Sequence, residues 1–173
     1  MLLRQFSLSA LLVLLIFVIQ ESVISQFRLP GGGFSLLLIF SLTWASLSTP
    51  TVGALIGFIA GLMMDLSQSA DGPLGQWTLI LIIAGYVLAF LAYGDDSVRG
   101  NPISIVILVS LAVGASLALY LISGLLLGLK IGSISGVAVT LIGNSLWTLA
   151  ITPLLLPAIS YVHNFIFDSK ARL

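Results

Sequence analysis

Residues 100–129 read GNPISIVILVSLAVGASLALYLISGLLLGL and contain no charged side chain. A helix that crosses a bilayer needs about 20 apolar residues, because the hydrocarbon layer is ~30 Å thick and each residue rises ~1.5 Å. The run shows no regular alternation of polar and apolar residues, as a membrane β-strand would. It therefore predicts a membrane helix, whose backbone satisfies its own hydrogen bonds.

The rest of the chain has a similar composition. Of its 173 residues, 7% are charged and 59% are hydrophobic, and the mean hydropathy is +1.22, whereas a soluble domain carries about 25% charged residues. Three further uncharged intervals cover residues 29–64, 72–94 and 131–167. The formal net charge of zero argues against a nucleic-acid partner. The absence of cysteine excludes disulfides and thiolate metal sites.

We expect one transmembrane domain over residues 1–173, an all-α bundle of six transmembrane helices. The first apolar run also resembles a secretory signal peptide, but we favour a retained helix because everything after it is membrane-embedded as well. Pro50 divides the 29–64 interval, and the last helix ends or kinks near Pro153 and Pro157 before an interfacial tail. The second helix is short for a span. The predicted helices cover residues 6–25, 34–48, 51–67, 74–93, 102–127 and 135–156.

Six spans would place both termini on one side of the membrane. Basic residues collect in cytoplasmic segments, and a cytoplasmic amino terminus puts more of them inside. The inner segments would then hold Arg4, Arg99, Lys170 and Arg172, and the outer loops Arg28 and Lys130. We therefore expect cytoplasmic termini, with the three tryptophans in the aromatic belts at the membrane interfaces.

The predicted helix 51–67 carries the best-organised pattern of the chain. Gly53, Gly57, Gly61 and Asp65 recur every four residues, so they form one ridge that a neighbouring backbone can approach closely. We interpret the ridge as packing within this bundle, with contact to another protein as the alternative. A carboxylate at bilayer depth must be neutralised, paired or close to water. Asp65 therefore either caps the amide groups that open the next helix or carries a function.

The other polar residues give weaker indications. Glu21 is expected to pair with Arg28, and Asn144 is one of the few polar residues far from the predicted helix ends. Residues 31–33 are glycines without the Lys and Ser/Thr of a phosphate-binding loop, so we expect a flexible turn. A single histidine, His163, is a poor metal site. We expect no metal and no cofactor, and the common hydrolase motifs are missing, so we expect no enzyme.

Residues 57–66, GFIAGLMMDL, are followed by Pro73-Leu-Gly75 and a helix that opens with Trp77. This segment resembles the rod shape-determining protein MreD family of bacteria. That family has a similar glycine-spaced helix ending in an aspartate, a short turn, and a Pro-Leu-Gly or related start of the next helix. Length, the nearly loop-free layout and an acidic residue late in the first helix also fit, so the resemblance covers essentially the whole chain. It assigns five motif positions: Gly57, Gly61, Asp65, Pro73 and Gly75.

The resemblance implies a non-enzymatic scaffold in the bacterial cytoplasmic (inner) membrane. Such a scaffold would contact MreC, a single-span protein with a periplasmic domain. It would also join the elongation complex that links the MreB cytoskeleton to peptidoglycan synthesis by a glycosyltransferase and a transpeptidase.

The family is distantly similar in architecture to the substrate-binding subunits of energy-coupling-factor vitamin transporters, and such a subunit is the alternative function. Those subunits use small residues spaced by four on the first helix, whereas this chain has bulky ones there: Leu11, Leu14, Leu15 and Val18. Handling of membrane lipids between the helices is a third possibility.

Overall fold

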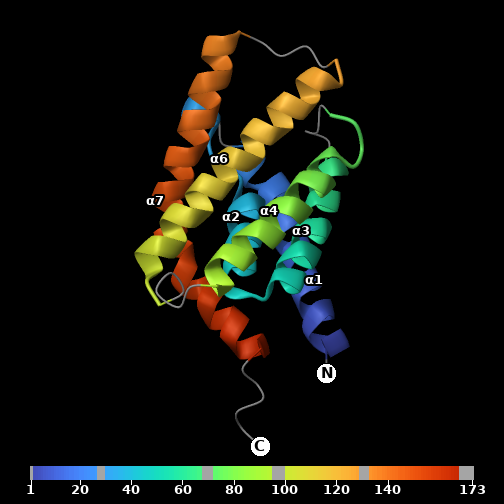
Figure 1. The fold of residues 1–173 in the computed structure, drawn as a ribbon, viewed down its shortest axis with the longest axis vertical. Helices are drawn as coiled ribbons and strands as arrows, with labels where there is room; N and C mark the ends of the chain where they lie inside the picture. Colours follow the sequence, from blue (N-terminus) through green and yellow to red (C-terminus); the bar gives the residue numbers. More distant parts are fainter. Residues whose placement is uncertain (1, 27–29, 68–71, 95–99, 129–132, 168–173) are drawn as a thin grey trace, which may run out of the picture.

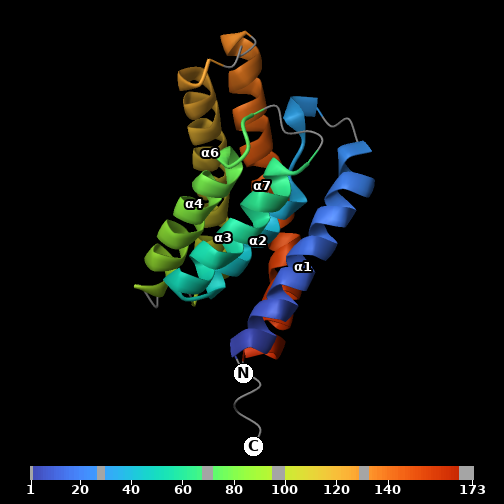
Figure 2. The ribbon, with the colours of Figure 1, turned by 90° about the vertical axis from the view of Figure 1, so that its right-hand side faces the viewer.

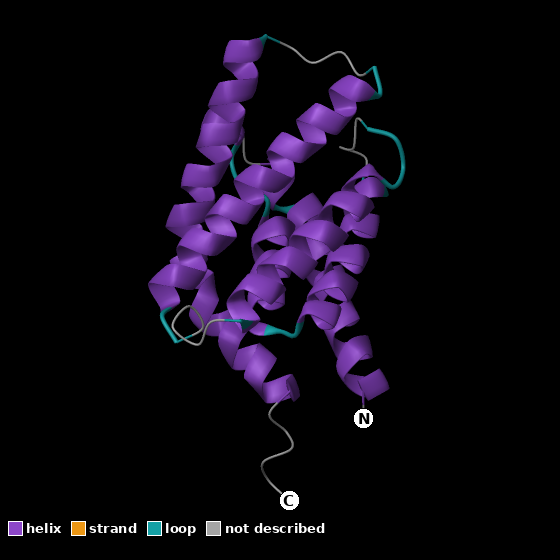
Figure 3. Ribbon diagram, in the orientation of Figure 1, coloured by secondary structure: helices purple, strands orange, loops and turns teal. Residues whose placement is uncertain are grey.

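The computed structural model describes residues 2–26, 30–67, 72–94, 100–128 and 133–167. All regular elements in these ranges are helical (Figure 3), which confirms the all-α prediction. Two short 3₁₀ turns, η1 (Ile24–Gln26) and η2 (Pro30–Gly32), follow the first helix. The α-helices are α1 (Leu2–Ser22), α2 (Leu36–Leu47), α3 (Pro50–Asp65), α4 (Gln76–Tyr93), α6 (Pro102–Leu126) and α7 (Ile134–Phe167).

Successive helices run up and down the long axis of the molecule (Figure 1), and α1 lies along one side of the bundle (Figure 2). The start of α1 and the end of α7 therefore lie at the same end. A hydrogen bond joins them there, in which Gln5 Nε2 donates to the Ile166 carbonyl oxygen at 3.2 Å. We call this the terminal end of the bundle, and the other the distal end.

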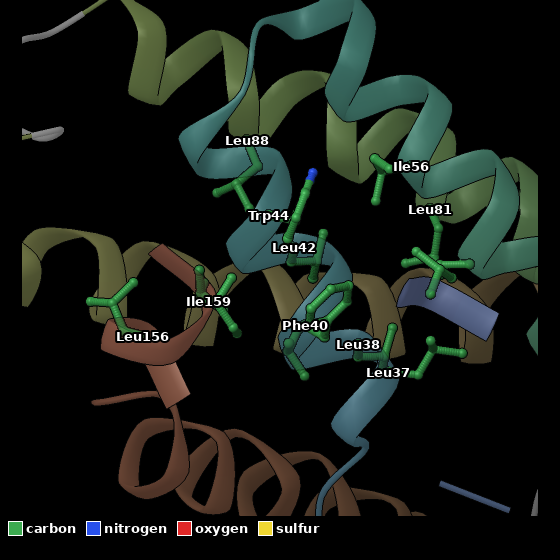
Figure 4. Close-up of a cluster of buried hydrophobic side chains, with 14 of the residues drawn as sticks. Leu37, Leu38, Phe40, Leu42, Trp44, Ile56, Leu81, Leu88, Leu156 and Ile159 are labelled. Atoms are coloured by element: carbon green, nitrogen blue, oxygen red, sulfur yellow. The ribbon is translucent and has the colours of Figure 1, made fainter. Parts of the chain in front are cut away.

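Helix α2 is the centre of the bundle, and it contacts all five other α-helices. Every residue from Leu37 to Ser46 is buried. The composition of α2 fits this position, because a helix that is apolar on all sides can be enclosed by other helices as well as by lipid. Its side chains form the core together with leucines and isoleucines of the surrounding helices (Figure 4).

The length of α2 agrees with the expectation that the second helix is short for a span. With 12 residues, the helix is about 18 Å long at ~1.5 Å per residue, well short of the ~30 Å hydrocarbon layer. Helix α3 has 16 residues. Four described helices are long and apolar enough to cross a membrane: α1, α4, α6 and α7.

The last helix is longer than predicted, because α7 continues through both prolines to Phe167. Figure 1 shows its axis bending in the lower, red part. Each internal proline removes a backbone donor, so the carbonyl oxygen four residues before it loses its helical partner. For Pro153 that residue is Leu149.

The segment that we expected as a tail after residue 156 is part of α7, and its last turns are folded against the core. They are held there by three buried aliphatic side chains: Leu156, Ile159 and Ile166. Burial of this apolar face outweighs the local preference of proline to end the helix.

Many polar side chains inside the bundle are hydroxyls that bond within their own helix. Ser110 Oγ donates to the Val106 carbonyl oxygen at 2.8 Å, and Ser116 Oγ to the Ala112 carbonyl oxygen at 2.7 Å. Such bonds satisfy a small polar group without a partner from another helix. Serine and threonine can therefore be buried in the core at little energetic cost.

We predict that Leu42→Ala destabilises the bundle by about 2–5 kcal/mol, the usual cost of a cavity at a buried leucine. Leu42 is 1% exposed at the centre of α2, whereas Leu79 on α4 is 61% exposed. The matched control Leu79→Ala should change little. Unfolding of the detergent-solubilised protein in a denaturing detergent titration measures both. Equal losses would show that α2 is not the core.

Candidate functional site at the α3–α4 contact

The glycine ridge of α3 faces α4 within the same chain. Gly53, Gly57 and Gly61 are all buried. A Cβ added at any of them would overlap atoms of α4, so only glycine allows the two backbones to approach this closely. The opposing residues are Gly85 for Gly53, Leu81 for Gly57 and Thr78 for Gly61. The ridge is therefore covered by α4 of the same chain, as expected for packing within the bundle.

Asp65 ends the ridge and binds the first turn of α4. Its Oδ2 accepts hydrogen bonds from the Gly75 N–H at 2.9 Å, the Thr78 N–H at 3.0 Å and the Thr78 hydroxyl at 2.6 Å. Its Oδ1 accepts from the Trp77 N–H at 3.0 Å. The first N–H groups of a helix have no partner within the helix, and its amino-terminal end attracts negative charge. The carboxylate of α3 therefore caps α4, which is one of the two roles that the sequence left open for it.

The turn between these helices explains the other motif positions. Gly75 has φ +95° and an added Cβ would meet no atom within 4 Å, so glycine is needed there for its backbone conformation. This left-handed turn directs the Gly75 N–H to Asp65. The Pro73 carbonyl oxygen accepts from the Gln76 N–H at 3.2 Å. The motif residues Asp65, Pro73 and Gly75 thus form one capping structure.

Gln76, which belongs to none of the motifs found in the sequence, joins this structure to α6. It is buried, and its Nε2 donates to the Tyr120 carbonyl oxygen at 2.8 Å and to Ser123 Oγ at 2.7 Å. Next to it, the ring of Trp77 stacks on the ring of Tyr120 with centroids 4.4 Å apart. In the sequence, this role was indicated only by a polar amide side chain near the start of a mostly apolar helix.

Glu21 lies at the same distal end and contacts the turn that follows α3. Ser67 Oγ donates to Glu21 Oε1 at 2.7 Å, while Arg28, the partner we expected, lies outside the described residues. The adjacent Gln20 Oε1 accepts from the Leu36 N–H at 2.6 Å, which caps the start of α2. Polar side chains at the end of α1 thus bind the neighbouring ends of α2 and α3.

The glycines after α1 pack against α7. Gly31, Gly32 and Gly33 all have positive φ, and an added Cβ on Gly31 would lie 3.2 Å from the Gly143 Cα. We expected these glycines to form a flexible turn. Instead, their small size lets the backbone of this segment contact the backbone of α7 closely. The neighbouring Asn144 is buried, and its Oδ1 has no hydrogen-bond partner among the described residues.

Two residues that we expected at the membrane interfaces, Trp44 and His163, are buried inside the bundle. Trp44 is 0% exposed, and His163, expected in an interfacial tail, is 7% exposed. Their rings meet edge to face with centroids 5.1 Å apart, and the His163 ring stacks on Phe167 at 4.6 Å. His163 Nε2 lies 3.0 Å from Ser48 Oγ. In the described part of the chain, no three His, Cys, Asp or Glu side chains gather as a metal site would require.

Comparison with known proteins adds no relative: no family model, no curated protein and no solved structure matches this chain.

We predict that Asp65→Asn destabilises the protein by at least about 2 kcal/mol, because hydrogen bonds to a charged group contribute about 1.5–3 kcal/mol each. Asparagine keeps the size of the side chain but turns an amide toward the donors of Gly75, Trp77 and Thr78. The conservative Asp65→Glu should lose less than Asp65→Asn. Denaturing titration in detergent checks this order. An Asp65→Asn variant as stable as the parent protein would refute the capping role.

We also predict that Gly57→Ala separates α3 from α4 and lowers the thermal midpoint by more than Gly94→Ala does. A Cβ at Gly57 would overlap the Leu81 carbonyl oxygen, whereas at Gly94 the nearest atom is the Phe90 carbonyl oxygen at 3.4 Å. Gly94→Ala is the matched control. Similar midpoints for both variants, measured by thermal unfolding in the same detergent, would contradict the close contact.

Proposed function

We propose that this chain is a non-enzymatic membrane scaffold of the bacterial cell-elongation complex, similar to MreD. The observation that carries the proposal is the Asp65 cap on α4. The segment that resembles the MreD family, from Gly57 to Gly75, forms one structural device in which the glycines bring two helices together and the aspartate fixes the second. A motif that serves packing in this way suits a rigid bundle that acts through lateral contacts.

The outward face of α1 is the surface we propose for an MreC-like partner. Only 11% of the residues in its apolar span are buried inside the bundle, the lowest share of the four long helices. Exposed large side chains line that face: Leu11, Leu14, Leu15 and Val18. A single-span partner helix could pack between such side chains along the whole length of α1.

The terminal end of the bundle is the side we propose to face the cytoplasm. The first and last helices meet there through Gln5 and Ile166. The basic residues Arg99, Lys170 and Arg172, on which this orientation depends, lie outside the described residues. In this orientation the terminal end would face MreB, and the membrane-embedded sides would face the glycosyltransferase and the transpeptidase.

The alternative function, a vitamin-binding transporter subunit, requires a ligand site among the helices. The space for a central site is already filled by α2, whose residues 37–46 are buried between the other helices. The packed centre therefore favours the scaffold over a central binding site.

The test is to deplete the protein in the bacterium that encodes it and to express variants in its place. We predict that its depletion makes rod-shaped cells round and that a photoreactive residue at Leu15 crosslinks to a single-span protein with a periplasmic domain. The double variant Leu11→Ala, Leu15→Ala should lose this partner and the rod shape. Its matched control on α4, Leu79→Ala with Leu91→Ala, should keep both.

Two outcomes would refute the scaffold. One is normal rod shape after complete depletion of the chain. The other is an equimolar vitamin that co-purifies with the protein and is identified by mass spectrometry, which would favour the transporter subunit.

A further inference from the structure

A cavity of about 610 Å³ opens at the terminal end of the bundle, between α2, α6 and α7. Its volume lies in the range of roughly 300–1,000 Å³ that is usual for small-molecule sites. It is separate from the α3–α4 contact, which lies on other helices. Its walls include Leu47 of α2, Ile105 of α6, and four residues of α7: Leu156, Ser160, His163 and Asn164.

The polarity of this cavity changes along the helix axes. Leu156 and Ile105 are buried and form its inner part, while Ser160 and Asn164 are more exposed and lie nearer the end of the bundle. From Leu156 to Asn164 is about 12 Å at ~1.5 Å per residue. Leu156, Ser160 and Asn164 share one helix face because they are spaced by four positions, and His163 lies three positions after Ser160. Along its α7 wall, the cavity is thus apolar inside and polar toward the terminal end of the bundle.

We propose that this cavity binds one phospholipid of the surrounding bilayer. A phospholipid has the same order of groups, with an acyl chain toward the centre of the membrane and a phosphate headgroup at the surface. The chain would lie against Ile105 and Leu156, and the phosphate oxygens would accept hydrogen bonds from Ser160 and Asn164. Helix α6 begins beside the cavity at Pro102, and the amino-terminal end of its dipole adds attraction for phosphate.

The buried imidazole of His163 gives this site a fixed wall. Its ring is held between Trp44 and Phe167 and against Ser48, so this wall of the cavity is positioned before a ligand arrives. Preorganised groups lose less conformational entropy on binding. The proposal depends on the membrane placement of the chain and is independent of the cell-shape function.

The test uses the purified full-length protein, delipidated in detergent and mixed with dioleoyl phosphatidylglycerol or dioleoyl phosphatidylethanolamine. Native mass spectrometry should show one tightly bound lipid per chain. The double variant Ser160→Leu, Asn164→Leu should bind at least about tenfold more weakly, as expected when two hydrogen bonds are lost. The control Tyr161→Leu, Phe165→Leu changes exposed residues of the same helix turns and should bind as the parent does.

Two further ligands separate the headgroup from the chain. Dioleoylglycerol, which lacks the phosphate, should bind at least about tenfold more weakly than the phospholipids. Glycerol phosphate, which lacks the chains, should not displace them. Equal binding by the double variant and its control would overturn the proposal, as would dioleoylglycerol binding as tightly as the phospholipids.

A second measurement does not depend on whether the variants fold. A phosphatidylglycerol with a photoreactive group on its acyl chain, bound to the parent protein at one equivalent, should label the α6 segment around Ile105 or the α7 segment around Leu156. Labels confined to other helices would overturn the proposal. None of these outcomes bears on the crosslinking test with the single-span partner.

Discussion

The hydrogen bonds between the Asp65 carboxylate and the start of α4 are the constraint on which the α3–α4 pair depends. They satisfy three backbone donors of a helix end and place a negative charge where the helix dipole favours it. Unpaired, the same donors would be costly in an apolar medium. The glycine ridge makes this arrangement possible, because it brings the two backbones close enough for a short aspartate to reach across.

The remaining helices are arranged around α2. At the distal end, polar side chains of α1, α3 and α4 bind neighbouring helix ends. At the terminal end, ring contacts around His163 and the Gln5 hydrogen bond hold the last turns of α7. The long helices thus leave their outer faces apolar and exposed, as a bundle that meets lipids or partner helices in the membrane requires.

Much of this fold could be predicted from the sequence, since long uncharged runs indicated the helical class and the approximate ends of α4 and α6. The ridge and a capping role for Asp65 followed from spacing by four and from the cost of a buried charge. Composition could not show that α2 is enclosed or that Trp44 is buried, because lipid and protein core are equally apolar. The prolines of α7 indicated an end or a kink; the helix bends but continues, because burial of its last turns outweighs the preference of proline to end it. Gln76 of α4 donates hydrogen bonds to α6, and a single sequence does not show which residues of another helix it contacts.

The central claim is that a side chain of α3 satisfies the first backbone donors of α4, and amide hydrogen exchange tests it most directly. In detergent micelles, the N–H groups of Gly75, Trp77 and Thr78 should exchange as slowly as those in the middle of α4, although first-turn amides usually exchange quickly. If these three amides exchanged as fast as those of an exposed helix end, the carboxylate would not be their partner, and Asp65 would not be the cap of α4.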